Sequence, residues 1–208
     1  MKLLHLIELV REDLRYDPRR DWRASEIAQE MAKGFGEWEQ ELHNLIRDKR
    51  IAILFPGRVM PRTMNLSDET LISVDGATAW LVRKGIVPQV VVTDLDGLEV
   101  IPKEPVYVVL LHGDNLKYLY KVYEMEKVVF ATQVFPKGSL LFTGGFTDGD
   151  RALALAMKYG AREVKLLNFD VSEVGEYSKP SDYPLLLKEK MRKLAWAERI
   201  VDFLLTHS

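Results

Sequence analysis

Aspartates follow two apolar runs of the sequence, each at the point where the run ends. Asp75 comes directly after the run at residues 71–74, and the run at 90–92 leads into Asp94 and Asp96, which one residue separates. Uninterrupted apolar runs are typical of parallel strands that are covered on both faces. Since open α/β sheets bind their ligands at the carboxyl ends of such strands, the sequence predicts that these carboxylates share one ligand site.

The concentration of negative charge indicates the chemistry of this site. Carboxylates a few ångströms apart repel each other, and one of them takes up a proton unless a cation lies between them. Oxygen ligands without a neighbouring Cys or His suit Mg²⁺ better than Zn²⁺. We therefore expect a magnesium site that includes Asp94 and Asp96. The alternative for an isolated D-x-D pair is a solvated loop in which the two side chains cap a turn.

Another polar motif, HGDN, ends the apolar run at residues 106–111 and again brings an acid, Asp114, to the end of a predicted strand. Asn115 is a candidate contact for a nucleobase or a phosphate. His112 is the one histidine of the sequence in such a position, and it has either a functional role or a structural hydrogen bond.

The motif TGGFTDGDR precedes a predicted helix. Thr147 and Asp150 have the spacing of a capping box, which accounts for Asp150. Capping accounts neither for Asp148 nor for Gly144 and Gly145, whose lack of a side chain lets a backbone approach a ligand closely. The N-terminus of the helix also attracts phosphate, so we expect a phosphate contact here.

Basic residues in two loops are further candidates for phosphate binding. Lys179 lies in the loop VGEYSKP, and Arg58 and Arg62 follow the first predicted strand. The two arginines either grip phosphate with their guanidinium groups or remain solvated. Neither of the glycine motifs G-x-G-x-x-G and G-K-[ST] is present.

These motifs are carried by apolar runs that alternate with segments of helical spacing. The alternation predicts an α/β fold with a mostly parallel sheet that helices cover on both faces. The predicted strands are residues 51–55, 71–74, 90–92, 106–111, 127–131, 139–142 and 163–168. The predicted helices are residues 2–15, 24–47, 77–84, 116–124, 151–159 and 183–206.

The first two predicted helices come before any strand. We therefore expect an N-terminal helical segment at residues 1–49 and an α/β catalytic domain at residues 50–208. The second of these helices carries an apolar stripe that serves either as core or as a homodimer contact, with core packing favoured. The stripe consists of Ile27, Met31, Trp38, Leu42 and Leu45.

The composition of the 208-residue chain excludes several classes of function. It contains no cysteine, which rules out disulfides, thiolate catalysis and Cys-based metal sites. A net charge of −2 argues against a nucleic-acid or anionic membrane surface as the main partner. Because Glu8 and Arg11 interrupt the N-terminal apolar residues and no long apolar run follows, we expect a cytoplasmic protein without a membrane span.

Four motifs, in this order along the chain, resemble the archaeal 6-hydroxymethyl-7,8-dihydropterin pyrophosphokinase (MptE-like) family. They are VDGATAWLVRKGIVPQVVVTDLDG, HGDN, GGFTDGDRALALA and VGEYSKP. The resemblance runs from about residue 50 to the C-terminus, and the first and third motifs are more distantly similar to thiamin pyrophosphokinase. Gln89, where both families tend to have an acid, and the loop FPGRVMPRT depart from the family pattern.

The resemblance implies transfer of diphosphate from ATP to the hydroxymethyl group of a pterin, with Mg²⁺ required and AMP released. It also implies a step in folate or methanopterin-type cofactor biosynthesis. By resemblance, Asp94 and Asp96 form the metal-binding D-x-D, Asp75 is the acid of the D-G-A turn, and Asp148 is the acid of the T-D motif.

Asp114 and Asn115 match a motif that is particular to the pterin family. The mechanism that follows from the resemblance makes Asp114 and Asp148 further metal ligands. Asp75 or Asp148 accepts the proton of the attacking hydroxyl, and the sequence does not choose between them. Arg151 balances charge on the transferring group or is a solvated residue of the first helical turn.

Two other functions remain open from the sequence. Thiamin pyrophosphokinase has the same chemistry with a different acceptor, so a change of acceptor in an AMP-release assay distinguishes the two. A non-catalytic nucleotide- or metal-binding module would bind ATP and release no AMP.

Overall fold

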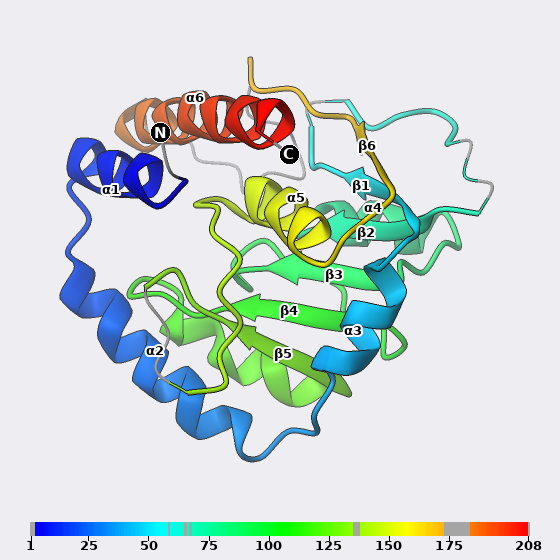
Figure 1. Ribbon diagram of the computed structural model, residues 1–208, viewed down its shortest axis with the longest axis horizontal. Coiled ribbons are helices and arrows are strands. Elements are labelled where there is room, and N and C mark those ends of the chain that lie inside the picture. The colour runs from blue at the N-terminus through cyan, green and yellow to red at the C-terminus, as the bar shows by residue number, and fades with distance from the viewer. Residues whose placement is uncertain are drawn as a thin grey trace.

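An all-parallel sheet forms the centre of the computed structural model, which describes residues 3–57, 59–64, 66, 68–134, 138–172 and 184–207 (Figure 1). Its strand order is β5-β4-β3-β2-β1-β6, and every neighbouring pair runs parallel. The predicted α/β class with a mostly parallel sheet is confirmed. The strands of the described residues are β1 (Arg50–Leu54), β2 (Thr70–Val74), β3 (Val90–Thr93), β4 (Val106–Leu110), β5 (Lys127–Ala131) and β6 (Glu163–Leu167).

The predicted strand at residues 139–142 does not form. Leu141 makes only an isolated bridge to Ala131 at the end of β5. Gly138 and Gly144, which flank the run, have positive φ angles of 88° and 81°. These left-handed glycines turn the chain away from the direction of β5 on both sides, so a four-residue apolar run cannot extend the sheet.

One face of the sheet lies under a layer of helices in which α5 packs directly on β1, β2 and β3, while α6 packs on α5 and α1 (Figure 1). Alternate strand residues, such as Ile51 and Val92, form a single core with Leu6 and Ile200 from the helices. The helices that contribute to this core are α1 (Leu3–Leu14), α3 (Glu39–Ile46), α5 (Asp148–Lys158) and α6 (Pro184–Thr206).

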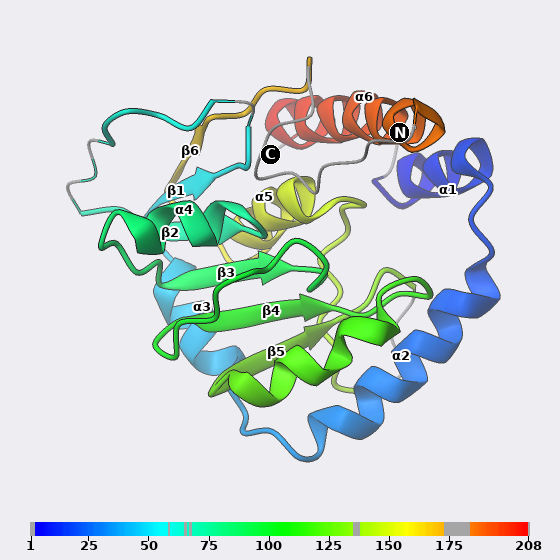
Figure 2. The same cartoon turned by 180° about the vertical axis from the view of Figure 1, so that it is seen from behind.

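The opposite face is covered by α4 (Ala77–Arg83) and by a 3₁₀ helix, η1 (Leu116–Glu124) (Figure 2). Here α4 packs on β2, and α2 (Pro18–Ala32) packs along the edge strand β5. Strand residues that point this way, such as Tyr107 and Phe130, are buried beneath η1 and α2. Helices therefore cover both faces of the sheet, as predicted.

The N-terminal segment contains three helices within the described residues, whereas the sequence predicted two. The helix predicted to begin at residue 24 begins at Pro18, because Asp17 caps it by accepting the Arg19 N–H over 3.0 Å and proline suits the first helical position. The helix ends at Ala32, before the segment that contains Gly34. The single helix predicted over residues 24–47 is therefore wrong, and its second half is α3.

The apolar stripe predicted on this segment packs inward. Ile27 and Met31 contact the core beneath α2, while Trp38, Leu42 and Leu45 contact the core beneath α5. Burial within the chain accounts for the stripe. The homodimer and the division at residues 49 and 50 stay predictions.

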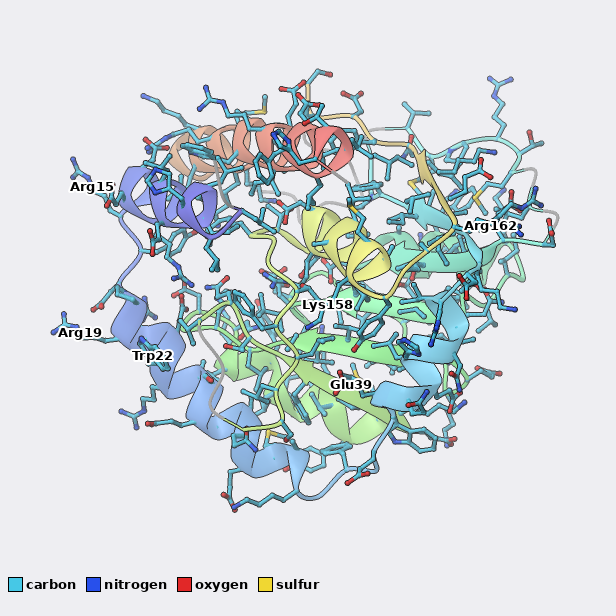
Figure 3. All side chains as sticks on the ribbon, viewed as in Figure 1. Arg15, Arg19, Trp22, Glu39, Lys158 and Arg162 are labelled. Atoms are coloured by element: carbon cyan, nitrogen blue, oxygen red, sulfur yellow. The ribbon has the colours of Figure 1, made fainter. Side chains whose placement is uncertain are left out.

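The helices keep polar sides toward solvent. In α1, Leu6, Ile7 and Val10 are buried, and in α2, Arg19 projects from the side away from the sheet (Figure 3). No helix in the described part of the chain is both long and apolar enough to cross a lipid bilayer.

Candidate active site

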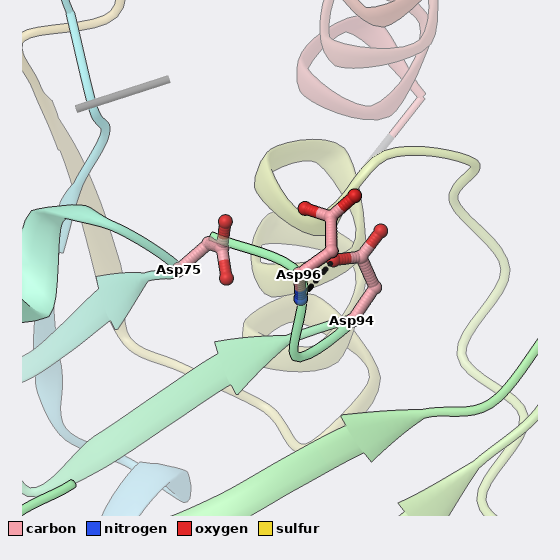
Figure 4. Close-up of side chains that lie close together, drawn as sticks. All are labelled: Asp75, Asp94 and Asp96. Atoms are coloured by element: carbon pink, nitrogen blue, oxygen red, sulfur yellow. Dashed lines mark hydrogen bonds between the residues drawn. The ribbon is translucent and has the colours of Figure 1, made fainter. Parts of the chain in front are cut away.

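Three aspartates meet where β2 and β3 end (Figure 4). The two strands are parallel neighbours, with Val74 opposite Val92, so the residues that follow them emerge at the same edge of the sheet. One carboxylate oxygen from each of Asp75, Asp94 and Asp96 lies within 4.8 Å of the others. The structure thus brings together the acids that the sequence assigned to one ligand site.

The backbone around these aspartates adopts uncommon conformations. Asp75 and Leu95 have positive φ angles of 42° and 74°, which are unusual outside glycine and cluster at functional sites. Gly97 lies so close to Asp75 that a Cβ atom here would collide with Oδ2 of the carboxylate. The Thr93 hydroxyl donates to Asp75 Oδ1 over 2.7 Å and accepts the Leu95 N–H over 2.8 Å. Thr93, which the sequence patterns did not reveal, therefore fixes the direction of the Asp75 carboxylate.

Asp148, in the first turn of α5, lies beside the cluster. Its Oδ2 atom accepts the Asp94 N–H over 3.1 Å. Its Oδ1 atom is buried and has no hydrogen-bond partner among the described residues. An acceptor buried without a donor is costly, and a cation would satisfy it. The donor set, which consists of carboxylate oxygens, fits Mg²⁺.

The ionisation of these carboxyl groups is strongly perturbed. Burial, together with the charge of Asp94, raises the pKa of Asp75 to about 8. Burial and the charges of Asp94 and Asp75 raise the pKa of Asp148 well above its usual value. Burial alone would raise the pKa of Asp94, but hydrogen bonds from His112 and Asp96 outweigh it and lower that pKa. At neutral pH the metal-free cluster therefore holds protons that a divalent cation would displace.

His112 donates to the cluster through a defined tautomer. Its Nδ1 atom accepts the Asp114 N–H over 3.3 Å, so the proton of the neutral ring lies on Nε2. Nε2 is 3.3 Å from Asp94 Oδ2. The sequence left open whether His112 has a functional role or makes a structural hydrogen bond. The hydrogen bond is present, and its acceptor, Asp94, is a candidate metal ligand.

Asn115 links the main chain at the ends of β3 and β4 by hydrogen bonds. Its buried side-chain amide donates to the carbonyls of Asp94 and Leu110 over 2.6 and 2.7 Å, and its carbonyl accepts the His112 N–H over 2.9 Å. Main-chain groups thus occupy the donors of the side chain. Its predicted contact with a nucleobase or phosphate stays a prediction.

Asp114 lies outside the carboxylate cluster. Its side chain is exposed and forms an ion pair with Arg20 of α2 over 2.8 Å. Among the described residues, carboxylate oxygens of Asp75, Asp94 and Asp96 lie within 4.8 Å of one another, and Asp148 accepts the Asp94 N–H, whereas Asp114 takes part in neither arrangement. The structure therefore does not bring Asp114 together with the other proposed metal ligands.

The TGGFTDGDR motif forms a tight turn into α5. Thr147 and Asp150 make the predicted capping box. Gly145 has a positive φ of 78°, and a Cβ atom there would lie 2.7 Å from the backbone nitrogen of Arg151. This close packing explains why residue 145 is a glycine. Contact of Gly144 and Gly145 with a ligand stays a prediction.

Arg151 is fully buried, so the alternative of a solvated first-turn residue is wrong. Its guanidinium donates to the carbonyls of Gly144 and Phe146 over 3.5 and 3.2 Å. Burial lowers its pKa, and the charges of Asp148 and Asp150 oppose that change. The side chain thus holds the turn together and adds positive charge close to the acids.

A cavity of about 230 Å³ extends from the acids toward α6. It is lined by Asp75, Asp96 and Asp148 and by Phe55 and Phe169, whose ring centroids are 5.0 Å apart. Both aromatic residues follow strands, β1 and β6, but no polar motif marked them in the sequence. Lys190, Lys193 and Asn168 also line the cavity, and sequence reasoning missed them as well.

Of the three basic candidates from the sequence, Lys179 and Arg58 fall outside the described residues, and Arg62 is exposed. Gln89, which departs from the family pattern, lies at the amino end of β3, where its side-chain oxygen accepts the Leu71 N–H over 2.7 Å. That departure therefore lies at the end of β3 opposite to Asp94.

The fold and the site define an α/β protein whose parallel sheet carries carboxylates suited to a divalent cation beside the N-terminus of a helix. More specifically, the chain belongs to the MptE-like family, since the family model described as "6-hydroxymethylpterin diphosphokinase MptE-like" matches residues 63–176. This match confirms the resemblance drawn from the four motifs.

Relatives from three archaea carry the name 6-hydroxymethyl-7,8-dihydropterin pyrophosphokinase. The protein from Pyrococcus furiosus is 35% identical over 95% of this chain and 90% of its own length. The protein from Methanothermobacter thermautotrophicus is 39% identical over 65% of this chain and 62% of its own length. The protein from Methanocaldococcus jannaschii is 26% identical over 94% of this chain and 91% of its own length. The family relationship extends over nearly the whole chain.

Proposed function

We propose that this protein transfers diphosphate from ATP to the hydroxymethyl group of 6-hydroxymethyl-7,8-dihydropterin and releases AMP. The observation that carries the proposal is the carboxylate cluster of Asp75, Asp94 and Asp96 at the edge of the sheet, in a chain of the MptE-like family. The names of the relatives support a pterin as the acceptor. The reaction would serve folate or methanopterin-type cofactor biosynthesis in an archaeal cytoplasm.

Mg²⁺ is the cation that this cluster suits best. Asp94 and Asp96 are its first ligands, and the unpartnered Oδ1 atom of Asp148 is a third. When bound, the ion neutralises charge on the phosphates of ATP.

The residues of the chain orient the reactants. The hydroxymethyl oxygen attacks the β-phosphorus in line, the bond from that phosphorus to the oxygen of the α-phosphate breaks, and AMP leaves with that oxygen. Asp75 or Asp148 accepts the hydroxyl proton, since both carboxyl groups line the cavity beside the proposed ligand Asp96. Arg151 offsets negative charge close to Asp148.

Phosphate recognition falls to the start of α5. Thr147 and Gly149 line the cavity there, where backbone N–H groups and the helix dipole favour an anion. Gly144 and Gly145 give the preceding turn its shape. Lys179 remains a proposed phosphate contact that lies outside the described residues.

The aromatic residues that line the cavity suit the flat ring of the acceptor. Phe55 and Phe169, whose rings contact each other, could extend this contact to a heteroaromatic ring, an interaction that is favourable beyond the area it buries. Lys190 and Lys193 also line the cavity and complement oxygen atoms of the ring or of a phosphate.

The test is to incubate the protein with ATP, Mg²⁺ and 6-hydroxymethyl-7,8-dihydropterin and to separate AMP from ADP by chromatography. We expect AMP and the pterin diphosphate in equal amounts, and no AMP when the pterin or Mg²⁺ is omitted. AMP with thiamin alone would identify a thiamin pyrophosphokinase. ATP binding without AMP from either acceptor would identify a non-catalytic module.

A further inference from the structure

Helix α2 forms hydrogen bonds with the main chain of the loop that carries His112. The Arg20 guanidinium donates to the Gly113 carbonyl over 3.1 Å, and the Asp21 carboxylate accepts the Gly113 N–H over 3.2 Å. Both main-chain polar groups of Gly113 are thus bonded to one helix. A Cβ atom on Gly113 would lie 2.5 Å from the Cβ of Arg20, so the helix and the loop are in direct contact.

Asp21 is the stronger of the two attachments. It is a buried carboxylate, 5% exposed, whose second oxygen accepts the Gln133 side-chain amide over 2.6 Å. Hydrogen bonds to a buried charge are roughly twice as strong as neutral ones. The ion pair of Arg20 with Asp114 joins two exposed side chains and contributes less.

The loop that is hydrogen-bonded to α2 in turn positions Asp94. His112, next to Gly113, faces Asp94 Oδ2, and Asn115 donates to the Asp94 carbonyl. A shift of the loop would therefore move both the side chain and the main chain of a proposed metal ligand.

We infer that Asp21, assisted by Arg20, is a positioning residue for the cation site, because α2 holds the loop that orients Asp94. Both residues precede the region that the family model matches, residues 63–176, so nothing in that match assigns them a role. The inference deepens the proposed function and rests on it for the activity measurement alone. Metal affinity tests it independently.

The decisive variant is Asp21→Asn. A carboxylate accepts from both Gly113 and Gln133, whereas an amide accepts from one and presents its own N–H groups to the other. The double variant Asp21→Asn with Gln133→Glu restores both bonds, since the new amide donates to the new carboxylate and still accepts from Gly113. The negative charge also stays beside Arg11, which donates to the Gln133 carbonyl.

The affinity for Mn²⁺, a paramagnetic substitute for Mg²⁺, is measured by electron paramagnetic resonance for each full-length variant. For Asp21→Asn we expect about tenfold weaker Mn²⁺ binding and about tenfold lower kcat, as is typical when residues supporting a metal ligand are lost. For the double variant we expect both the Mn²⁺ affinity and kcat to lie within about twofold of the wild-type values. A lower melting temperature with unchanged Mn²⁺ affinity would mean that Asp21 has only a structural role, and would overturn the inference.

Exposed arginines on α2 provide a matched pair that leaves the core intact. Arg20→Met removes the contacts to Gly113 and should weaken Mn²⁺ binding by about threefold, whereas Arg23→Met, three positions along the helix, should leave it unchanged. If Arg20→Met and Arg23→Met bind Mn²⁺ with equal affinity, and Asp21→Asn does not change that affinity, then α2 does not position the cation site. If the wild-type protein binds Mn²⁺ but releases no AMP, the proposed function fails while the affinity comparison still decides this inference.

Discussion

Asp94 has a lowered pKa, whereas burial raises the pKa of Asp75 and of Asp148 beside it. Asp94 is buried as well, but among the three carboxyl groups it is the one that faces His112. The sequence indicated that these acids would meet. It could not indicate that the pKa of Asp94 would fall, because that depends on a histidine that follows a different strand.

Replacing a ligand of the D-x-D motif should remove activity and keep the fold. For Asp94→Asn or Asp96→Asn we expect kcat/KM with ATP and pterin to fall by about 100-fold or more, the size typical for loss of transition-state charge stabilisation. Circular dichroism should match the wild type. Asp48→Asn, an exposed substitution that precedes β1, is the control. Near-normal turnover in either variant would refute the assignment.

The same substitution at Asp114 tests a point on which the resemblance and the structure differ. Since Asp114 lies outside the cluster and pairs with Arg20, we expect Asp114→Asn to lower kcat/KM by less than about tenfold. A loss as large as that of Asp94→Asn would mean that the loop moves to bring Asp114 onto the cation. The same kinetic assay decides this.

The stability of the metal-free protein should depend on pH. The pKa of Asp75, about 8, is higher in the folded protein than in the unfolded chain, so the folded state binds more protons between about pH 4 and pH 8. The free energy of unfolding therefore falls as the pH rises through this range, by up to about 1.4 kcal/mol per pH unit for each such proton.

Calorimetry of the metal-free protein at pH 6 and pH 8 should thus give a higher melting temperature at pH 6. Mg²⁺ should raise the melting temperature more at pH 8, where it competes less with protons. Asp75→Asn is the control, because an amide does not titrate and the difference between the two pH values should shrink. A profile that is flat, or that rises toward pH 8, would contradict the assigned ionisation.

At the scale of elements, the six strands of the sheet could be predicted, whereas the start of α2 and the failure of residues 139–142 to form a strand could not. Runs such as 90–92 consist of consecutive apolar residues because β3 is buried on both faces, so the sequence itself indicates the strand. The sequence predicted that the second helix begins at residue 24, whereas Asp17 and Pro18 begin it. The apolar spacing that was used for the prediction starts only with the residues that pack along β5, so it missed the polar first turns of α2.

The turn after β3 depends on a glycine. In Gly97→Ala the new Cβ would collide with the Asp75 carboxylate, so the turn or the carboxylate must shift. We expect about tenfold lower kcat and a loss of about 1–3 kcal/mol in the free energy of unfolding, the usual cost of overpacking. Gly34→Ala is the control, because its nearest contact, at 3.5 Å, is ordinary. Denaturant unfolding and the AMP assay measure both effects, and unchanged values would show that the turn has room.

At the scale of the whole molecule, the site combines residues that lie far apart in the chain. Asp21 reaches Gly113, and Phe55 meets Phe169. The sequence revealed the acids because each follows a strand of the same parallel sheet. It could not reveal Asp21 or Phe169, because their contacts depend on how helices and edge strands pack, which no local pattern records.

The aromatic and acidic groups that line the cavity should be separable by kinetics. Phe169 is partly buried and lines the cavity, so Phe169→Leu keeps an apolar side chain there and removes the ring. We expect the KM for the pterin to rise by about five- to tenfold, which is within the range for the loss of one stacking contact, while the KM for ATP changes little. A rise in the KM for ATP alone would mean that the adenine, not the pterin, contacts Phe169.

The sheet order also constrains how the protein forms during translation. Strands β1 to β5 pair with one another in the order in which the ribosome delivers them, but the outer edge of β1 waits for β6. A nascent chain that ends before β6 already carries the three clustered aspartates but lacks Phe169. The aromatic pair proposed to contact the acceptor is therefore completed last, and the unpaired edge of β1 is the surface that a chaperone would have to shield until then.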